Sequence, residues 1–194
     1  MTGVVTPPRL RLTVGRPTED CLSPHACDTN RTMDSHSYPI AHTPPGGYGT
    51  EFPPLIMPGC TEPLVDGAPD LRGTWRVISA TRGGVPVAPD DRLMSYTERI
   101  EQAGNRIVDC GGGTIADCRA DGTEENGVHD VSVFDYVTPI HVIASYEDGA
   151  FVLRPVGIPG IEVTRRLDED GHMVWTRPDL GGMVAVLERV STPN

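Results

Sequence analysis

The chain has 194 residues, a formal net charge of −11 and a pI near 4.8, and all of its basic residues are arginine. A protein this acidic repels nucleic-acid phosphates and anionic membrane surfaces, so we expect neither nucleic acid nor a membrane as a partner. The length favours one folded domain with an extension over two full domains. The 22 glycines and 19 prolines are typical of a chain with many turns.

The first residues contain no apolar segment long enough for a secretory signal, and no later run approaches the ~20 apolar residues of a membrane span. We therefore expect a cytoplasmic protein. Five cysteines form an odd number without a compact spacing, which favours reduced thiols over a disulfide framework. Cys110 and Cys118 are interpreted as small apolar residues of neighbouring strands.

Residues 1–69 read as an irregular, Pro-rich N-terminal tail that cannot build a core alone. Residues 9–14 are an exception, because they alternate well enough to add as an edge strand or to dock on a partner surface. Residues 51–58 are apolar, and they suggest either a lid over an apolar opening or a linker that lies on the folded domain. Potential metal ligands also occur in the tail, but their spacing matches no zinc motif, so no metal site is predicted. They are Cys21, His25, Cys27, His36 and His42.

Residues 70–194 read as a run of short strands, beginning with the alternating apolar and polar residues of 71–79. Asp-Gly pairs at 148–149 and 170–171 mark hairpin turns. Further strands are expected at 93–101, 106–110, 114–120, 128–134, 140–146, 151–154, 161–167, 173–177 and 182–190. Because no helical period separates them, the sequence predicts an all-β, antiparallel up-and-down barrel of about eight to ten strands. Closure removes the open edges and leaves room for one small ligand, whereas an immunoglobulin-type sandwich fits the consecutive hairpins less well.

Two features at the ends of this region resemble the lipocalin and calycin signature. They are Gly73-x-Trp75 in the first strand and Arg189 in the last. In that family an inward Trp of the first strand packs against an Arg of the closing strand. The resemblance covers residues 70–190 and implies a lipocalin-like β-barrel.

A cytoplasmic lipocalin-like barrel with a long N-terminal tail also resembles the bacterial [4+2] cyclases of spirotetronate and spirotetramate biosynthesis. This resemblance rests on the layout of the chain and on no catalytic motif. It implies a cofactor-independent Diels–Alder-type cyclase that encloses a linear polyene or polyketide intermediate in the barrel beneath an N-terminal lid. The alternative is a non-catalytic carrier or sensor of a hydrophobic small molecule, and a homodimer is left open.

The more apolar side of each strand should face the barrel interior, and this rule supplies the candidate site residues. The candidate catalytic residues are Tyr96, Glu98, His129 and Arg165. The candidate substrate-binding residues are Met94, Val131, Val133, Val142, Tyr146, Phe151, Leu153, Val163, Met173 and Trp175. Glu98 is expected to pair with Arg165, because an unpaired charge inside a barrel is costly, and this pairing is preferred to a general-acid role. His129 is interpreted as a rim residue beside Asp130 or as a proton-transfer group.

Overall fold

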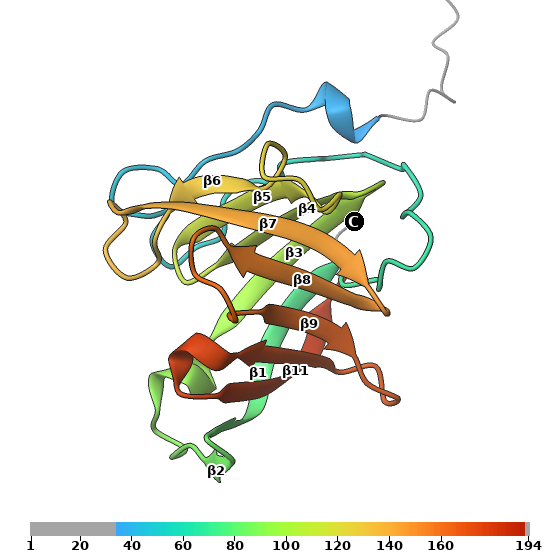
Figure 1. The fold of residues 1–194 in the computed structure, drawn as a ribbon. Helices are drawn as coiled ribbons and strands as arrows, with labels where there is room; N and C mark the ends of the chain where they lie inside the picture. The colour runs from blue at the N-terminus through green and yellow to red at the C-terminus, as the bar shows by residue number, and fades with distance from the viewer. Residues whose placement is uncertain (1–33, 193–194) are drawn as a thin grey trace, which may run out of the picture. The chain divides into compact units, whose positions relative to one another are not determined.

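The computed structural model describes residues 34–192, and these form an all-β unit (Figure 1). Within this range there are eleven strands, three short 3-10 helices and no α-helix. The strands are β1 (Gly73–Arg82), β2 (Val85–Pro86), β3 (Thr97–Ala103), β4 (Arg106–Gly111), β5 (Thr114–Arg119), β6 (Val128–Val131), β7 (Pro139–Glu147), β8 (Ala150–Pro155), β9 (Val163–Leu167), β10 (Met173–Arg177) and β11 (Met183–Ser191). The 3-10 helices are η1 (Ser35–Ser37), η2 (Arg92–Ser95) and η3 (Pro178–Leu180).

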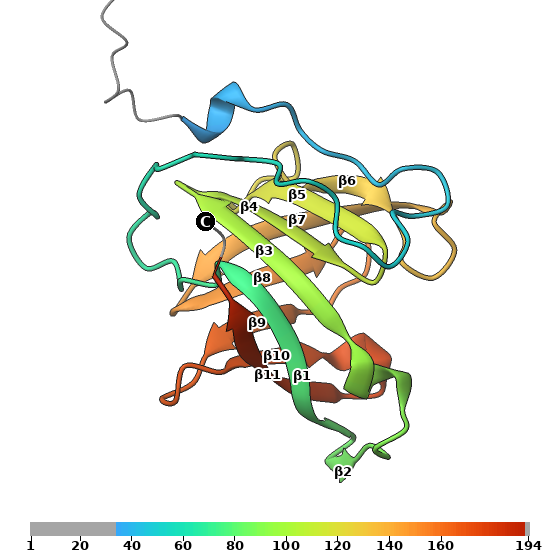
Figure 2. The ribbon, with the colours of Figure 1, turned by 180° about the vertical axis from the view of Figure 1, so that it is seen from behind.

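Ten of the strands form one antiparallel path in the order β5-β4-β3-β1-β11-β10-β9-β8-β7-β6, and β2 pairs only with β1. Nearly all neighbours follow one another along the chain, while the pairing of β1 with β11 joins the first strand to the last. The sheet curls into a nearly closed barrel, as the front and back views show (Figures 1 and 2). The predicted all-β, up-and-down fold class is therefore confirmed.

The two ends of this path approach each other between β5 and β6. Near the loop that joins these strands, the backbone N of Arg119 donates a hydrogen bond to the carbonyl of Asn126 at 2.8 Å. Thr43 connects β5 and β6 across this gap in the sheet, which we call the seam. Its backbone N and Oγ1 donate to Asp130 Oδ2 on β6 at 2.9 and 2.8 Å. The Thr43 hydroxyl also accepts from the backbone N of Ile115 on β5 at 2.9 Å. A residue of the N-terminal segment thus completes the barrel wall.

The first and last strands meet as the sequence predicts. Trp75 and Arg189 are register partners, and the Arg189 guanidinium lies 4.7 Å from the centre of the Trp75 ring. Trp75 Nε1 donates to the carbonyl of Leu71 at 2.7 Å, and Arg189 donates to the carbonyl of Asp70 at 2.6 Å. Gly73 has φ +133, and a Cβ there would lie 2.5 Å from a β11 carbonyl, so this position requires glycine.

Residues 34–65 run over the outer face of β3, β4 and β5 (Figure 2). Their apolar side chains build a second, smaller core against the outward residues of these strands. Its members include Tyr38, Ala41, Tyr48, Phe52, Ile56, Met57, Ala103, Val108, Cys110 and Ile115. As a result, every residue of β4 is buried, although one side of an antiparallel sheet often faces water.

A buried ion pair fastens the start of this segment to the barrel. Arg106 donates two hydrogen bonds to the Asp117 carboxylate, at 2.9 and 2.7 Å. The same guanidinium donates to the carbonyls of Ser35, Tyr38 and Pro39 at 2.6 to 2.9 Å. Because all these groups are satisfied, the pair tolerates its complete burial.

The apolar stretch 51–58 lies on this outer face. Its backbone N atoms at Ile56 and Met57 donate to the Glu101 carboxylate, at 2.8 to 3.1 Å. Arg99 donates to the carbonyl of Pro53 at 2.6 Å. This geometry places the stretch on the barrel wall, and a lid role for it stays a prediction.

One predicted strand begins later than expected. Residues 93–101 were predicted to be extended, but the chain forms η2 first and enters β3 only at Thr97. Asp91 is the reason, because its side chain accepts a hydrogen bond from the backbone N of Leu93 at 2.9 Å and so caps a helical turn. The correction moves Met94 from a strand to η2.

Cys110 and Cys118 lie on neighbouring strands as reduced, buried thiols, one in the outer core and one in the barrel interior. Between residues 34 and 192 no helix is long and apolar enough to cross a membrane. The predicted edge strand at 9–14 and the tail residues Cys21, His25 and Cys27 lie outside the described part of the chain.

Candidate ligand-binding site

A charged cluster is buried inside the barrel, near the end that carries η2 and the β8–β9 loop. Glu98 is the second residue of β3, Asp109 lies near the end of β4, and Arg165 lies in β9. The Arg165 guanidinium donates to Glu98 Oε1 at 3.1 Å, to Glu98 Oε2 at 2.9 Å and to Asp109 Oδ2 at 2.6 Å. The predicted pairing of Glu98 with Arg165 is therefore confirmed, and it includes a second carboxylate.

The cluster holds two carboxyl groups for one guanidinium. Burial and the nearby charge of Glu98 raise the pKa of Asp109 to about 7, and the attraction of Arg165 only partly offsets them. Near neutral pH the Asp109 carboxyl is therefore protonated for a large part of the time, unlike an exposed Asp. A protonated carboxyl inside an apolar barrel can donate a hydrogen bond as well as accept one.

Two aromatic side chains form one wall of the cluster. Tyr96 stacks on Trp175 with ring centres 5.0 Å apart, and its hydroxyl donates to Glu98 Oε2 at 3.2 Å. Burial raises the pKa of Tyr96 well above its usual value, so this side chain stays a neutral phenol. The Arg165 guanidinium lies 5.1 Å from the centre of the Trp175 ring.

Two buried polar atoms of this cluster have no hydrogen-bond partner among residues 34–192. They are Asp109 Oδ1 and Trp175 Nε1. Buried polar atoms in folded proteins are almost always paired, and an unpaired one costs roughly 1–3 kcal/mol. Each of these atoms therefore marks a position in the barrel that is chemically suited to a polar group of a ligand or to water.

The apolar part of the interior agrees with most of the sequence prediction. Seven predicted substrate-binding residues belong to the interior core or pack against it from the strands, and Met94 joins them from η2. The seven are Val142, Tyr146, Phe151, Leu153, Val163, Met173 and Trp175. Together with Trp75 they make the barrel interior a mainly apolar core with polar groups at one end.

The prediction of which β6 side chains face the barrel interior is wrong by one residue. Val128 is buried in the core and its register partner Val142 is half-buried against it, so His129 and its partner His141 face outward and are exposed. Val131 is half-buried on the same outward side as His129, by strand alternation. The apolar-side rule fails because the inward position next to Val128 is polar: it is Asp130, which Thr43 binds across the seam.

Val133 does not lie on a strand, because β6 ends at Val131 instead of continuing to residue 134. The loop that follows is held by Asp135, whose side chain accepts hydrogen bonds from the backbone N atoms of Val137 and Thr138 at 3.0 and 2.9 Å. Val133 lies half-buried beside Gly112 in the β4–β5 turn.

Two polar residues of the interior were missed by the sequence reasoning. Asp109 shares the side of β4 that carries the buried Ile107, and Gln102 shares the side of β3 that carries Ile100. Gln102 accepts from the backbone N of Leu71 at 2.6 Å and donates to the Tyr146 hydroxyl at 2.9 Å. Strand alternation applied to β4 as it was to β3 would have placed Asp109 in the site.

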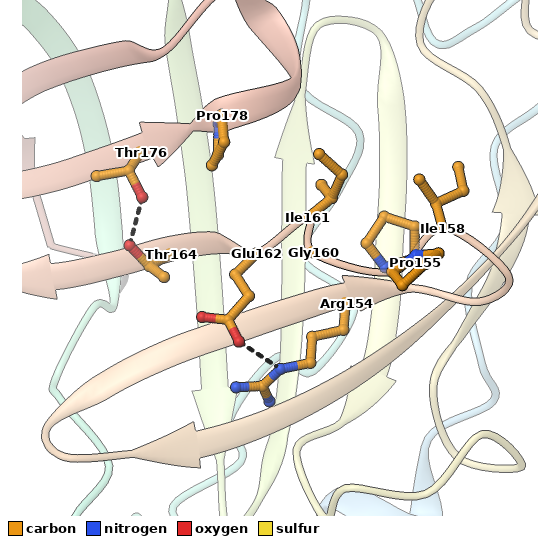
Figure 3. A pocket seen from close by; sticks show the side chains of 10 residues that line it. Arg154, Pro155, Ile158, Gly160, Ile161, Glu162, Thr164, Thr176 and Pro178 are labelled. Atoms are coloured by element: carbon orange, nitrogen blue, oxygen red, sulfur yellow. Dashed lines mark hydrogen bonds and ion pairs between the residues drawn. The ribbon is translucent and has the colours of Figure 1, made fainter.

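A groove of about 510 Å³ lies on the outer wall, beneath the β8–β9 loop (Figure 3). Ile158 and Ile161 line one side of it, and the hydroxyls of Thr164 and Thr176 meet at 2.6 Å on the other. Because the strand neighbours Arg165 and Trp175 are buried in the barrel, these threonines face away from the charged cluster. The groove is therefore separate from the interior site.

The fold and this site define a nearly closed, antiparallel up-and-down β-barrel with a charged and aromatic cluster buried at one end of an apolar interior, an arrangement compatible with a lipocalin-like fold. Comparison with protein-family models and with curated proteins finds no match for this chain.

Proposed function

We propose that the barrel binds an elongated, mainly apolar small molecule and acts on it as a lipocalin-like, cofactor-independent [4+2] cyclase. The observation that supports a ligand is the pair of buried, unpartnered atoms, Asp109 Oδ1 and Trp175 Nε1, at the polar end of an apolar interior. Ligand sites of this kind are apolar cavities in which a few polar groups set the orientation.

The cluster chemistry suits a substrate that carries a carbonyl group. The protonated Asp109 carboxyl and the Trp175 N–H are both potential donors. A donor to the carbonyl oxygen of the substrate would withdraw electron density from an adjacent alkene. Arg165 holds the Asp109 carboxyl in place from its other oxygen at 2.6 Å. Tyr96, stacked on Trp175, adds a flat apolar surface against which a conjugated chain can lie.

A [4+2] cycloaddition needs the protein only to orient the substrate and to polarise its carbonyl group. It makes two carbon–carbon bonds from electrons already present in the diene and dienophile, with no leaving group, oxidant or cofactor. Holding the two parts of one chain in a near-attack arrangement can contribute roughly 7–11 kcal/mol to such a reaction. Glu98, which is fully engaged by Arg165 and Tyr96, would set the geometry of the cluster and transfer no proton.

The test uses a set of synthetic linear trienes that carry an unsaturated ketone as the dienophile, with product and stereoisomer ratio followed by chiral liquid chromatography. We expect faster cyclisation and one favoured stereoisomer with the protein, and a large loss of both in Asp109→Asn with Trp175→Phe. The matched control is His172→Gln, a change at a half-buried residue of the β9–β10 turn, away from the charged cluster. Trienes that quench tryptophan fluorescence but cyclise at the buffer rate would instead support a carrier, and trienes that do neither would reject both functions.

A carrier is the second candidate, because the charged groups of the cluster mostly satisfy one another. Arg165 makes three hydrogen bonds within it, which is the arrangement expected of a structural ion-pair network. A carrier would use the same two unpartnered atoms to orient its ligand.

A further inference from the structure

Two histidines meet on the outer face of the barrel, away from the charged cluster. His129 on β6 and His141 on β7 are cross-strand register partners, and both are exposed. Their Nδ1 atoms lie 2.8 Å apart, with the two rings edge to face at 4.8 Å between centres.

The hydrogen-bond pattern fixes the tautomers of this pair. His129 Nε2 lies 2.6 Å from the carbonyl oxygen of Glu124, and since a carbonyl can only accept, Nε2 carries the hydrogen. His129 Nδ1 of the neutral ring is then a lone pair, and His141 Nδ1 is the donor between the two rings. A ring whose far N–H is held by a backbone carbonyl is the arrangement that orients histidine ligands in metal sites.

We propose that His129 and His141 form a binding site for a late first-row divalent metal ion, Ni²⁺ or Cu²⁺. The ion displaces the hydrogen shared by the two Nδ1 atoms and lies to one side of the line that joins them, and His141 keeps a neutral ring by carrying its hydrogen on Nε2 after exchange with water. The site lies on the outer surface, so it is independent of the proposed cyclase or carrier function.

The separation of the nitrogens selects the metal. With metal–nitrogen distances of about 2.05 Å, two nitrogens 2.8 Å apart subtend about 86° at the ion. That is the angle between neighbouring ligands in square-planar or octahedral coordination, which suits Cu²⁺ and Ni²⁺. A tetrahedral Zn²⁺ site would need the nitrogens about 3.3 Å apart.

The surroundings favour a cation and leave room for its other ligands. His129 borders a pocket of about 270 Å³ that His42 and Glu125 also line. The cation of this pocket, Arg119, is in contact with His36 at 2.9 Å. Both rings are exposed, so water can complete the coordination from the open side.

The test is titration of the full chain with NiCl₂ by isothermal calorimetry, for the wild type and for His129→Gln, His141→Gln and His172→Gln. We expect a Ni²⁺ site that either of the first two changes weakens at least about tenfold, or about 1.4 kcal/mol. His172→Gln is the matched control because His172 lies in the β9–β10 turn, where its ligand atom is within 4.8 Å of those of Asp168 and Asp170. Zn²⁺ should bind the wild type more weakly than Cu²⁺ does.

Electron paramagnetic resonance of the Cu²⁺-loaded protein gives a second readout. We expect hyperfine structure from two nitrogen ligands in the wild type and from one nitrogen ligand in His129→Gln and in His141→Gln. Both substitutions are on exposed side chains, so the metal-free variants should keep the wild-type circular dichroism and urea midpoint. Ni²⁺ affinity that survives both substitutions, or is lost only in His172→Gln, would overturn the proposal, as would a Cu²⁺ spectrum without nitrogen coupling.

Discussion

Replacement of Asp109 by Asn should make the stability of the barrel less dependent on pH. The buried carboxyl has a pKa of about 7 in the folded state, compared with an ordinary value of 3.8. Its contribution to stability is therefore complete below about pH 4 and is lost as the pH rises through 7, because the unfolded chain releases this proton far more easily. The substituted amide would imitate the protonated acid at every pH, with its carbonyl oxygen still able to accept from Arg165.

The size of the effect follows from the shift of about 3 pKa units, each worth about 1.36 kcal/mol. Between pH 4 and pH 7.5 the wild type should lose up to about 4 kcal/mol of unfolding free energy that Asp109→Asn retains. Urea unfolding at four pH values and constant ionic strength measures this difference. All other titratable groups are common to both proteins, so their contributions cancel in the comparison.

Glu147→Gln is the matched control. Glu147 is exposed, and its hydrogen bonds with Arg154 lower its pKa from 4.5 to about 2. Its contribution to stability is therefore complete above about pH 5 and is lost as the pH falls toward 2. The control should change the stability by a nearly constant amount between pH 5 and pH 7.5, the range in which most of the Asp109 effect develops. Parallel pH profiles for the wild type and Asp109→Asn would refute the view that Asp109 is a buried carboxyl with a raised pKa.

Three further substitutions test other parts of the fold. Arg165→Met leaves two carboxyl groups buried without their cation and should cost about 3–5 kcal/mol in urea unfolding at pH 7, of which a second change, Glu98→Gln, should recover part. Arg106→Met removes the donor that holds the carbonyls of residues 35–39, so limited proteolysis should cleave this stretch faster than in the wild type; equal cleavage rates would contradict the contacts. Arg189→Ala removes the cation from the Trp75 ring and should lower the unfolding free energy by about 1–2 kcal/mol. An unchanged urea midpoint would show that the contact between Arg189 and Trp75 does not stabilise the barrel.

The barrel itself could be predicted from the sequence because two-residue alternation and hairpin turns are local signals. The pairing of Trp75 with Arg189 is implied by the resemblance to the lipocalin signature, and the first and last strands do place the two residues in register. The pair of Glu98 and Arg165 followed from the cost of leaving either charge alone inside.

The orientation of β6 could not be predicted in the same way. Counting apolar residues favoured Val131 and Val133 as the inward side, but the actual inward side includes Asp130. What makes this position tolerable is Thr43, which lies 87 residues earlier and binds the carboxylate. No local pattern carries information about a partner so distant in the chain.

The fold of residues 34–65 shows that this part of the N-terminal tail is a structural part of the barrel. β4 carries Asp109 toward the interior and Val108 and Cys110 toward the outside, and both faces are buried. Removal of the chain through residue 58 would uncover the outer face and would leave the Arg99 and Glu101 side chains without the backbone partners that residues 53–57 supply. Such a truncation would weaken the strands that hold Glu98 and Asp109, so a loss of activity would not distinguish a lid from a structural support. The lid hypothesis is separable from the fold only by changes that leave residues 34–65 on the barrel.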